Sequence, residues 1–331
     1  MQAMQTHKIN LGRRELFCQP GESVLDALLR EQVEIAYGCR QGACQSCIAR
    51  SLDGAPPAAA QAGLKDVLRH QNHFLACLCY PERDMAIGIG SPEQRFCHAT
   101  VTGKRLLNAE TLLLTLRTEE ALDYYAGQFV NLKRSDGLQR SYSIANNRTH
   151  ANNLTFHIRR LAGGRFSAWA HDELQLGDLL EVSDPQGLCY YLPSSQPRNL
   201  LLIGTGSGLA PLAGIVSEAL HHGHAGEIHL YHGSREMDGL YWIDEMRELA
   251  AQYANFHYTP CVSRGVAADG VASGRANDVA MQRLPDLQGW RVYLCGHPDM
   301  VQQSKRQAFL KGAKFDDIYA DAFHVASATL D

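Results

Sequence analysis

Three cysteines near the start of the chain, Cys39, Cys44 and Cys47, are separated by four and two residues in the stretch YGCRQGACQSC. This is the spacing of thiolate ligands that hold a 2Fe–2S cluster, which needs four of them. Cys77 and Cys79 are the two candidates for the fourth ligand. Zinc fits less well, because a single residue separates this second pair. Disulfides would require an oxidising compartment, and the N-terminal residues contain no apolar signal segment.

The cysteine loop, together with the Leu-Ala-Cys stretch that ends at Cys77, resembles the plant-type ferredoxin family, whose fourth ligand lies in such a stretch. The resemblance implies that Cys77 is a ligand, that Cys79 is not, and that roughly residues 5–92 adopt the α+β β-grasp fold. Gly38 and Gly42 agree with an iron–sulfur site, because glycines let the backbone wrap closely and aim amide hydrogens at the sulfurs.

The elements that must hold this loop are predicted from their own patterns. Residues 7–11 and 15–18 are expected to pair as a hairpin. Ser23 and Asp26 have the spacing of a helix start, and apolar residues follow along one side of that helix. The apolar residues are Val24, Leu25, Leu28 and Leu29.

A second module is predicted as an antiparallel β-barrel. Short alternating runs with frequent turns occur at residues 99–105, 111–117, 128–132, 141–145 and 154–160. By periodicity alone these strands fit any small barrel. The function of the module is therefore predicted from two short motifs, one on a strand and one after the last strand. The first is Arg-Ser-Tyr-Ser at 140–143, and the second is Gly-Gly-Arg-Phe-Ser at 163–167.

These two motifs resemble the flavin-binding motifs of the ferredoxin–NADP reductase superfamily, and the form of the first implies FAD rather than FMN. Arg140 can fork onto a phosphate, Tyr142 can pack on the flavin ring, and Ser143 can hydrogen-bond near its reactive nitrogen. Amides of a glycine turn that opens a helix suit a pyrophosphate. The expected residues of that turn are Gly163, Gly164 and Ser167, and the resemblance adds Ile158 and Arg159 on the preceding strand.

A third module begins with a fully apolar run at residues 200–203, typical of a buried parallel strand, and a glycine-rich turn that opens a helix. Such a turn suits a pyrophosphate, although its spacing differs from the dehydrogenase fingerprint. Further strands at 227–231, 256–262 and 291–294 alternate with helical patterns, which predicts an α/β domain. The turn consists of Gly204, Thr205, Gly206, Ser207 and Gly208.

The turn and the Cys295-Gly296 pair closely resemble the NAD(P)-binding domain of the same superfamily, in which that cysteine lies near the nicotinamide. No lysine or arginine flanks Cys295 to lower its pKa, so a covalent role is not expected. The resemblance also implies an aromatic residue over the flavin after the last helix, and Phe323 is the candidate. Ser143 and Cys295 are therefore expected at the hydride-transfer centre.

The choice of dinucleotide rests on two exposed segments. Ser263 and Arg264 could hold the 2′-phosphate of NADPH, whereas Arg235 and Asp238 occur in a form typical of NADH users. No second basic residue follows Arg264 closely. NADH is therefore favoured, with NADPH as the alternative.

Length and composition exclude several classes of protein. The 331 residues predict two or three domains, and a net charge of −4 does not favour a nucleic-acid partner. Residues 200–220 are apolar but contain glycines, a proline and a glutamate, which favours strand, turn and helix over a membrane span. A cytoplasmic location is expected, with Cys18, Cys97, Cys189 and Cys261 as buried thiols and His221, His222 and His224 at a helix end rather than on a metal.

The modules are predicted at 1–93 (2Fe–2S ferredoxin), 94–196 (FAD barrel) and 197–331 (NAD(P)-binding α/β domain), with a linker at 90–93. This order resembles the reductase components of bacterial multicomponent oxygenases. It implies that electrons pass from NAD(P)H through FAD and the cluster to a terminal oxygenase or an intermediate carrier. The alternatives are another client, such as a deoxysugar dehydratase or a free-standing acceptor reductase, and a redox sensor without turnover.

Overall fold

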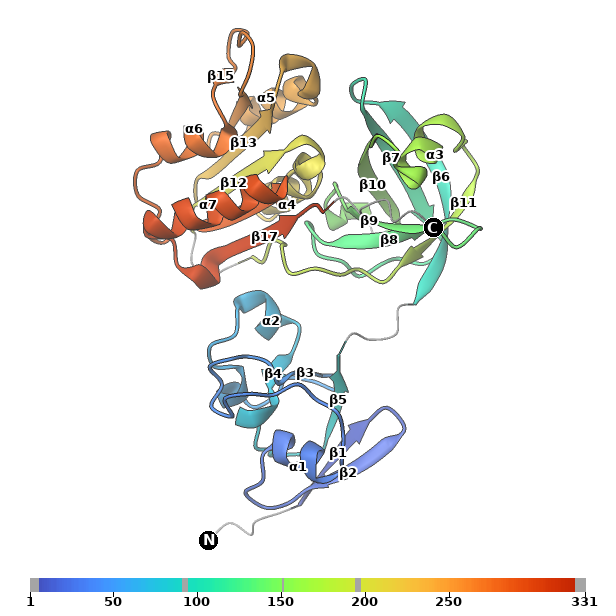
Figure 1. Ribbon diagram of the computed structural model, residues 1–331, viewed down its shortest axis with the longest axis vertical. Coiled ribbons are helices and arrows are strands. Elements are labelled where there is room, and N and C mark those ends of the chain that lie inside the picture. The colour runs from blue at the N-terminus through green and yellow to red at the C-terminus, as the bar shows by residue number, and fades with distance from the viewer. Residues whose placement is uncertain (1–5, 91–94, 151, 194–197, 325–331) are drawn as a thin grey trace. The chain divides into compact units, whose positions relative to one another are not determined.

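The structure is a computed structural model that describes residues 6–90, 95–150, 152–193 and 198–324. The chain forms two compact units, Met1–Gln94 and Arg95–Asp331. Figure 1 shows the elements of both, and each unit is described separately below. Residues 91–93 of the predicted linker lie outside the described residues.

The first unit is an α+β fold around a five-stranded sheet with the strand order β2-β1-β5-β3-β4. β1 pairs antiparallel with β2, as the sequence predicts, and parallel with β5. Ser23 caps α1 by accepting a hydrogen bond from the Asp26 amide (3.2 Å), and the apolar side of the helix is buried. The elements are β1 (His7–Leu11), β2 (Arg14–Cys18), α1 (Val24–Arg30), β3 (Ile48–Ser51), η1 (Ala58–Gln61), α2 (Asp66–His70), β4 (His73–Leu75), η2 (Ala76–Leu78) and β5 (Met85–Ile89).

The second unit begins with a six-stranded antiparallel sheet in the order β10-β7-β6-β11-β8-β9. A bridge between Ile144 and Phe156 joins its two ends and closes the barrel. The prediction of a strand at 141–145 is wrong by two residues, since β9 spans 139–143. Pairing with β8 ends at Ser143, and the next residue forms the bridge to Phe156 instead. The elements are β6 (Phe96–Leu106), β7 (Thr111–Thr118), β8 (Phe129–Lys133), β9 (Gln139–Ser143), η3 (Arg148–His150), β10 (Asn153–Arg159), α3 (Arg165–Asp172) and β11 (Leu179–Ser183).

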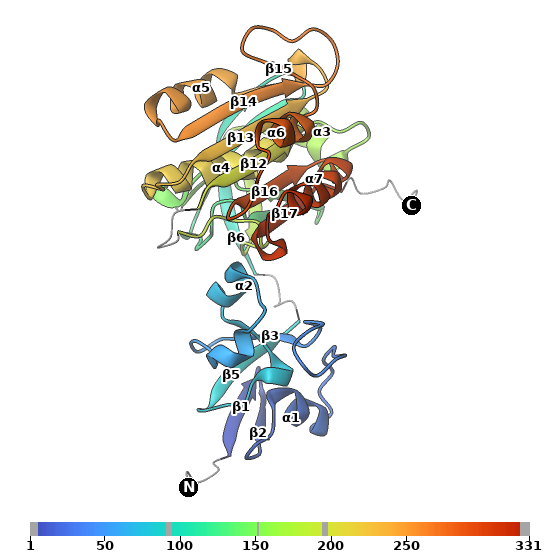
Figure 2. The ribbon, with the colours of Figure 1, turned by 90° about the vertical axis from the view of Figure 1, so that its left-hand side faces the viewer.

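The rest of this unit is an α/β domain with a six-stranded parallel sheet in the order β15-β14-β13-β12-β16-β17. Leu201 and Ile203 of β12 pack with residues of α6 and α7, and Figure 2 shows α4 and α5 on the other side of the strands. The elements are β12 (Leu200–Thr205), η4 (Gly206–Gly208), α4 (Leu209–His221), β13 (Ile228–Ser234), η5 (Met237–Gly239), α5 (Ile243–Gln252), β14 (Phe256–Val262), β15 (Ala272–Ser273), α6 (Ala276–Arg283), β16 (Arg291–Gly296), α7 (Pro298–Leu310), η6 (Phe315–Asp317) and β17 (Ile318–Ala322).

The strand order explains where a ligand site forms in this domain. The chain runs from β12 outward to β13 and β14, and then returns to the other side of β12 to form β16 and β17. The connections therefore diverge at the carboxyl ends of β12 and β16, and this switch point is where open α/β sheets leave a crevice for ligands. The glycine turn follows β12, and Cys295 lies at the end of β16.

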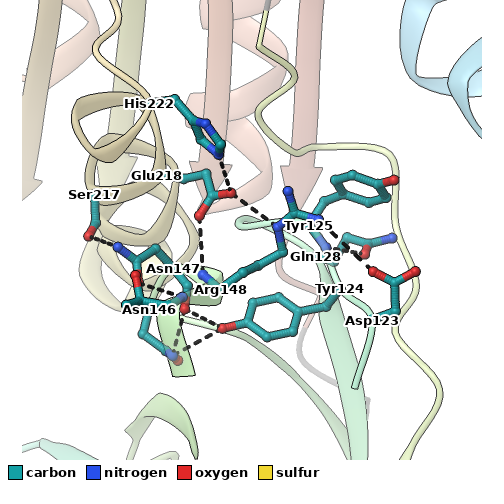
Figure 3. A network of polar contacts seen from close by, with 11 residues as sticks. Asp123, Tyr124, Tyr125, Gln128, Asn146, Asn147, Arg148, Ser217, Glu218 and His222 are labelled. Atoms are coloured by element: carbon teal, nitrogen blue, oxygen red, sulfur yellow. Dashed lines mark hydrogen bonds and ion pairs between the residues drawn. The ribbon is translucent and has the colours of Figure 1, made fainter. Parts of the chain in front are cut away.

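A buried polar network joins the barrel to the α/β domain (Figure 3). Glu218 of α4 is only 3% exposed. It accepts hydrogen bonds from the amide and from Nε of Arg148, each 3.1 Å long. The Arg148 guanidinium also lies 4.9 Å from the centre of the Tyr125 ring, and Asn147 donates to the Ser217 hydroxyl. The two domains are thus held together by an ion pair whose carboxylate is buried and whose arginine side chain is partly exposed.

The predicted fold classes of all three modules are confirmed, whereas several details differ. β17 and the short β15 were not predicted, since neither has a long apolar pattern. Cys18, Cys189 and Cys261 are buried as expected, but Cys97 is only half-buried. Gly223 has a φ of +63° and follows α4, which agrees with the predicted helix end. No helix in the described ranges is both long and apolar enough to cross a membrane.

Candidate functional site

The cysteine loop presents thiols and amides to one another at the surface of the first unit. Cys39 and Cys44 are exposed. The amides of Gln41 and Cys44 point at the sulfur of Cys39, at 3.4 and 3.3 Å, and the Cys39 amide points at the sulfur of Cys44 at 3.4 Å. The bond from the Cys39 amide is the main reason that the pKa of Cys44 falls to about 6, so this thiol is easily deprotonated.

Cys77 and Cys79 face different surroundings, although both are buried and only one residue separates them. Burial raises the pKa of Cys77 to about 11, and its sulfur also interacts with those of Cys47 and Cys39. Burial raises the pKa of Cys79 to about 12, with smaller contributions from Cys18 and Glu82. Cys77 therefore belongs to the same group of thiols as the loop, and Cys79 belongs to the core.

The described thiols are not gathered as closely as the ligands of one zinc ion. In a tetrahedral zinc site with Zn–S bonds of about 2.3 Å, the sulfurs lie about 3.8 Å apart. Across the ranges that the structure describes, no three cysteine sulfurs lie within 4.8 Å of one another. Gly42 fits the loop tightly: its φ is +81°, and a Cβ there would lie 2.6 Å from Cδ1 of Leu78. The loop is thus shaped to pass close to the residue that follows Cys77.

The first flavin motif lies on β9 at the mouth of the barrel. Ser143 is buried, Tyr142 is half-buried, and Arg140 is exposed and donates to the Gln139 carbonyl (2.7 Å). The Tyr142 ring lies 5.4 Å from that of Phe166 on α3, and burial raises the pKa of Tyr142. The strand and the helix that carry the two motifs therefore meet, although 20 or more residues separate them along the chain.

The second motif forms the expected glycine turn before α3. Gly163 has a φ of +70°, and a Cβ on Gly164 would lie 2.5 Å from the Ser167 oxygen, so both positions favour glycine. The Ser167 hydroxyl is already engaged, because it donates to the Gly164 carbonyl and accepts from the Leu161 amide. The sequence predicts Ser167 as a further donor near the helix start, and it lies in the first turn of α3. In the structure the free donors of the turn are backbone amides at the start of α3.

Ile158 and Arg159 lie side by side on β10 but differ in environment. The Ile158 side chain is fully buried in the barrel core, and its carbonyl lies 2.9 Å from Nε2 of His171. Arg159 is exposed and pairs with Glu110 at 3.0 Å. Its NH1 atom would lie 3.7 Å from a Cβ on Gly206, so its guanidinium is next to the glycine turn of the α/β domain.

At the switch point the turn after β12 packs backbone against backbone on the end of β16. A Cβ on Gly208 would lie 2.2 Å from the carbonyl oxygen of Cys295, and a Cβ on Gly296 would lie 2.6 Å from that of Thr205. Gly296 also has a φ of +121°. The Thr205 hydroxyl accepts from the His297 amide (3.1 Å). Only glycine fits at positions 208 and 296. No side chain caps the amides at the start of α4.

The sulfur of Cys295 is fully buried and contacts that of Cys189 at 3.7 Å. Burial, and then the contact with Cys189, hold the pKa of Cys295 well above its ordinary value, which argues against a nucleophilic thiolate. Phe323 follows β17 and is half-buried, and its amide donates to the Gly296 carbonyl (2.8 Å). The structure thus brings Phe323 to Gly296, the residue that follows Cys295. The contact between Cys189 and Cys295 could not be predicted from the sequence.

The residues expected to choose the dinucleotide lie together at the ends of β13 and β14. The Ser263 amide donates to the Ser234 carbonyl (3.1 Å) and the Arg264 amide to the Arg235 carbonyl (2.8 Å). The side chains of Arg235, Ser263, Arg264 and Asp238 are all exposed. Both arginines therefore share this edge with an acidic side chain.

Comparison with known proteins agrees with this arrangement along the whole chain. Family models match residues 8–82 as a 2Fe-2S iron-sulfur cluster binding domain, residues 98–191 as an oxidoreductase FAD-binding domain, and residues 202–306 as an oxidoreductase NAD-binding domain. The three matches follow one another in the predicted order.

Several curated relatives match over nearly their full length. The reductase component of the naphthalene 1,2-dioxygenase/salicylate 5-hydroxylase systems of Ralstonia sp is 31% identical over 321 residues, covering 93% of this chain and 95% of the relative. The aromatic O-demethylase reductase subunit of an Amycolatopsis strain is 32% identical, covering 90% and 92%. Among solved structures, the Amycolatopsis cytochrome P450 reductase GcoB matches with a TM-score of 0.68 and 30% identity, covering 96% of this chain and 99% of the other.

The chain belongs to the family of iron–sulfur flavoprotein reductases that form the reductase components of oxygenase systems. It is an oxidoreductase of the ferredoxin–NAD(P)⁺ reductase type, which transfers electrons from NAD(P)H through FAD and a 2Fe–2S cluster.

Proposed function

We propose that this chain is the NADH-dependent reductase of a terminal oxygenase, and that it delivers electrons to its partner one at a time from the cysteine loop. The observation that carries the proposal is the exposure of Cys39 and Cys44. An electron can pass to another protein only from a carrier near the surface. A cluster held by this loop would be such a carrier, because two of its cysteines are exposed. Oxygenase systems are named for relatives that this chain matches over at least 90% of its length.

The proposed ligands of the cluster are Cys39, Cys44, Cys47 and Cys77. The loop amides that point at the sulfurs of Cys39 and Cys44 would stabilise negative charge on the ligands. The partly buried side of the site, at Cys47 and Cys77, would be shielded from water by the core of the first unit. Cys79 is left out of the proposed set, because its thiol interacts with Cys18 rather than with the loop thiols.

For FAD, the proposed phosphate donors are the Arg140 guanidinium and the amides of the turn at Gly163 and Gly164. Arg140 suits this role because its side chain is exposed on β9. Tyr142 would pack on the flavin ring and Ser143 would hydrogen-bond near its reactive nitrogen. Ile158 would contribute only its backbone, since its side chain is buried in the barrel.

At the switch point, we assign the amides of Gly206, Ser207 and Gly208 to the pyrophosphate of the dinucleotide. Cys295 would border the nicotinamide as a neutral thiol, consistent with its raised pKa. Phe323 is proposed to cover the flavin ring until the nicotinamide arrives. When bound, the flavin supplies the conversion of one hydride into two single electrons, and the cluster carries them singly.

NADH is the proposed reductant because the edge formed by β13 and β14 carries Asp238 as well as Arg235 and Arg264. A carboxylate at this edge favours a ribose hydroxyl over a second phosphate group. We also propose that the protein works in the cytoplasm, since all ten of its cysteines are free thiols.

The test compares Cys44→Ser with Cys97→Ser, a change at a half-exposed cysteine outside the site. Electron delivery to a purified terminal oxygenase encoded nearby should fall at least about 100-fold in Cys44→Ser. NADH-driven reduction of a dye that takes electrons from the flavin should stay within about twofold in both variants. A Cys44→Ser protein that still reduces the oxygenase would refute the exit site. A wild-type protein that reduces the dye but not the oxygenase would favour a different client, such as a dehydratase.

A further inference from the structure

A group of side chains with donor atoms for a metal ion lies at the amino-terminal edge of the α/β sheet, at the opposite end of the strands from the glycine turn after β12. Glu227, His229 and His257 each offer one donor atom, and these atoms all lie within 4.8 Å of one another. In the ranges that the structure describes, no other group of three histidine, cysteine or carboxylate side chains meets this condition. The electron-transfer function uses none of them.

The sheet itself brings the three side chains together. β13 and β14 are parallel, and His229 and His257 are direct partners in their register. Partners on neighbouring strands point to the same face, and their two rings lie 4.5 Å apart with an angle of 36° between them. Glu227 lies two residues before His229 and therefore points to that face as well.

The backbone holds this edge in place from both sides. The Glu227 amide donates to the Asn199 side chain (3.0 Å), and the Glu227 carbonyl accepts from the Leu200 amide (2.7 Å). The Trp290 ring packs edge-on against His229, with ring centres 5.4 Å apart. The donors are therefore placed by paired strands rather than by a free loop.

The distances between the donor atoms suit a single small cation. Oε2 of Glu227 lies 2.6 Å from Nε2 of His257 and 3.9 Å from Nε2 of His229. Tetrahedral coordination with metal–ligand distances of about 2.1 Å requires donors about 3.4 Å apart, a value between these two. Nε2 of His257 and Oε2 of Glu227 form a hydrogen bond, and these two atoms would separate by about 0.8 Å to share an ion. The side chains of Glu227 and His257 are half-exposed, which leaves a position open to water.

We propose that Glu227, His229 and His257 bind one divalent transition-metal ion of the zinc type, with water as a further ligand. Two imidazoles and one carboxylate are a common donor set for Zn²⁺, and imidazole does not favour Ca²⁺ or Mg²⁺. The ion links β13 to β14 at the edge opposite the glycine turn. The seven residues of β13 separate it from that turn by about 20 Å, so the ion stabilises the domain and does not take part in hydride transfer.

Calorimetric titration of the untagged holoprotein with ZnCl₂, followed by metal analysis, tests the proposal. The wild type should bind one zinc ion per chain while its iron content stays unchanged. Glu227→Gln and His257→Phe should each weaken zinc binding at least about 100-fold, and both retain much of the shape of the original side chain. The matched control is His221→Ala, which removes an exposed histidine from the His-His-Gly-His stretch and should bind zinc like the wild type.

A second measurement guards against damage to the fold. Thermal unfolding is monitored by tryptophan fluorescence. Zinc should raise the unfolding midpoint of the wild type and leave the midpoint of His257→Phe unchanged. The absence of saturable binding to the wild type would overturn the proposal. So would zinc uptake that releases iron, which would assign the binding to the cysteines, or loss of binding in His221→Ala alone.

Discussion

The buried pair of Arg148 and Glu218 offers a quantitative test of how the barrel is held to the α/β domain (Figure 3). Arg148→Met keeps an apolar stem next to Tyr125 but removes the guanidinium, which leaves the Glu218 carboxylate with His222 as its side-chain partner. Removing one partner of a fully buried pair costs about 3–5 kcal/mol. The Arg148 side chain is 33% exposed, so water offsets part of the loss and we expect about 2–3 kcal/mol.

The effect should depend on pH in a defined direction. Burial alone would raise the pKa of Glu218, but hydrogen bonds from the Arg148 amide and guanidinium outweigh it and hold the pKa below its ordinary value of 4.5. In the wild type this carboxylate therefore stabilises the fold above about pH 4.5 and loses that contribution as the pH falls through its lowered pKa. In Arg148→Met, burial acts with less opposition and raises the pKa. The difference between variant and wild type should therefore shrink from pH 7 to pH 4.

Tryptophan fluorescence during thermal unfolding is a suitable assay, because all three tryptophans (Trp169, Trp242 and Trp290) lie in the second unit. A loss of about 2–3 kcal/mol corresponds to a fall in the midpoint of about 4–12 °C for a unit of this size.

The control is Arg160→Met, which breaks an arginine–carboxylate pair with Asp172 whose side chains are 45% and 51% exposed. That change should lower the unfolding midpoint much less than Arg148→Met does, because water screens an exposed pair. Equal losses in Arg148→Met and Arg160→Met, or a loss from Arg148→Met that does not change with pH, would refute the reasoning.

Three further predictions concern the cofactor sites. Cys77→Ser should lose the visible absorption of the cluster, and Cys79→Ser should retain it. The reverse result would show that Cys79, and not Cys77, is the fourth ligand. Gly208→Ala would place a Cβ 2.2 Å from the Cys295 carbonyl, so stopped-flow reduction of the flavin by NADH should slow at least about tenfold while FAD stays bound; an unchanged rate would show that this contact relaxes freely. The wild type should have a higher kcat/KM for NADH than for NADPH, and Arg264→Ala should change the value for NADH by less than about threefold; a preference for NADPH that this variant abolishes would contradict the assignment.

Much of the fold could be predicted from local patterns. The buried strand at residues 200–203, the helix start at Ser23 and the glycine turns each depend on neighbours in the chain, and the structure has them close to the predicted positions. The choice of Cys77 over Cys79 came from resemblance to a family. The structure adds a physical reason, because Cys77 interacts with the loop thiols and Cys79 with Cys18.

Contacts between distant segments could not be predicted. Cys189 resembles any buried cysteine in the sequence, and only the packing of the segment after β11 on β16 brings it to Cys295. The pairing of His229 with His257 depends on the register of two parallel strands, which the strand patterns do not specify. The hydrogen bonds of the Ser167 hydroxyl to Leu161 and Gly164 depend on how the glycine turn closes on α3, which the sequence does not specify.

The central claim is that one chain carries electrons from the nicotinamide to the cysteine loop. The most direct test is to reduce the protein with NADH under anaerobic conditions and to monitor the flavin by optical absorption and the cluster by EPR in the same experiment. The account predicts that the flavin bleaches and that the EPR signal of a reduced 2Fe–2S cluster appears within the time of a single turnover. A flavin that bleaches while the cluster remains EPR-silent until dithionite is added would contradict it.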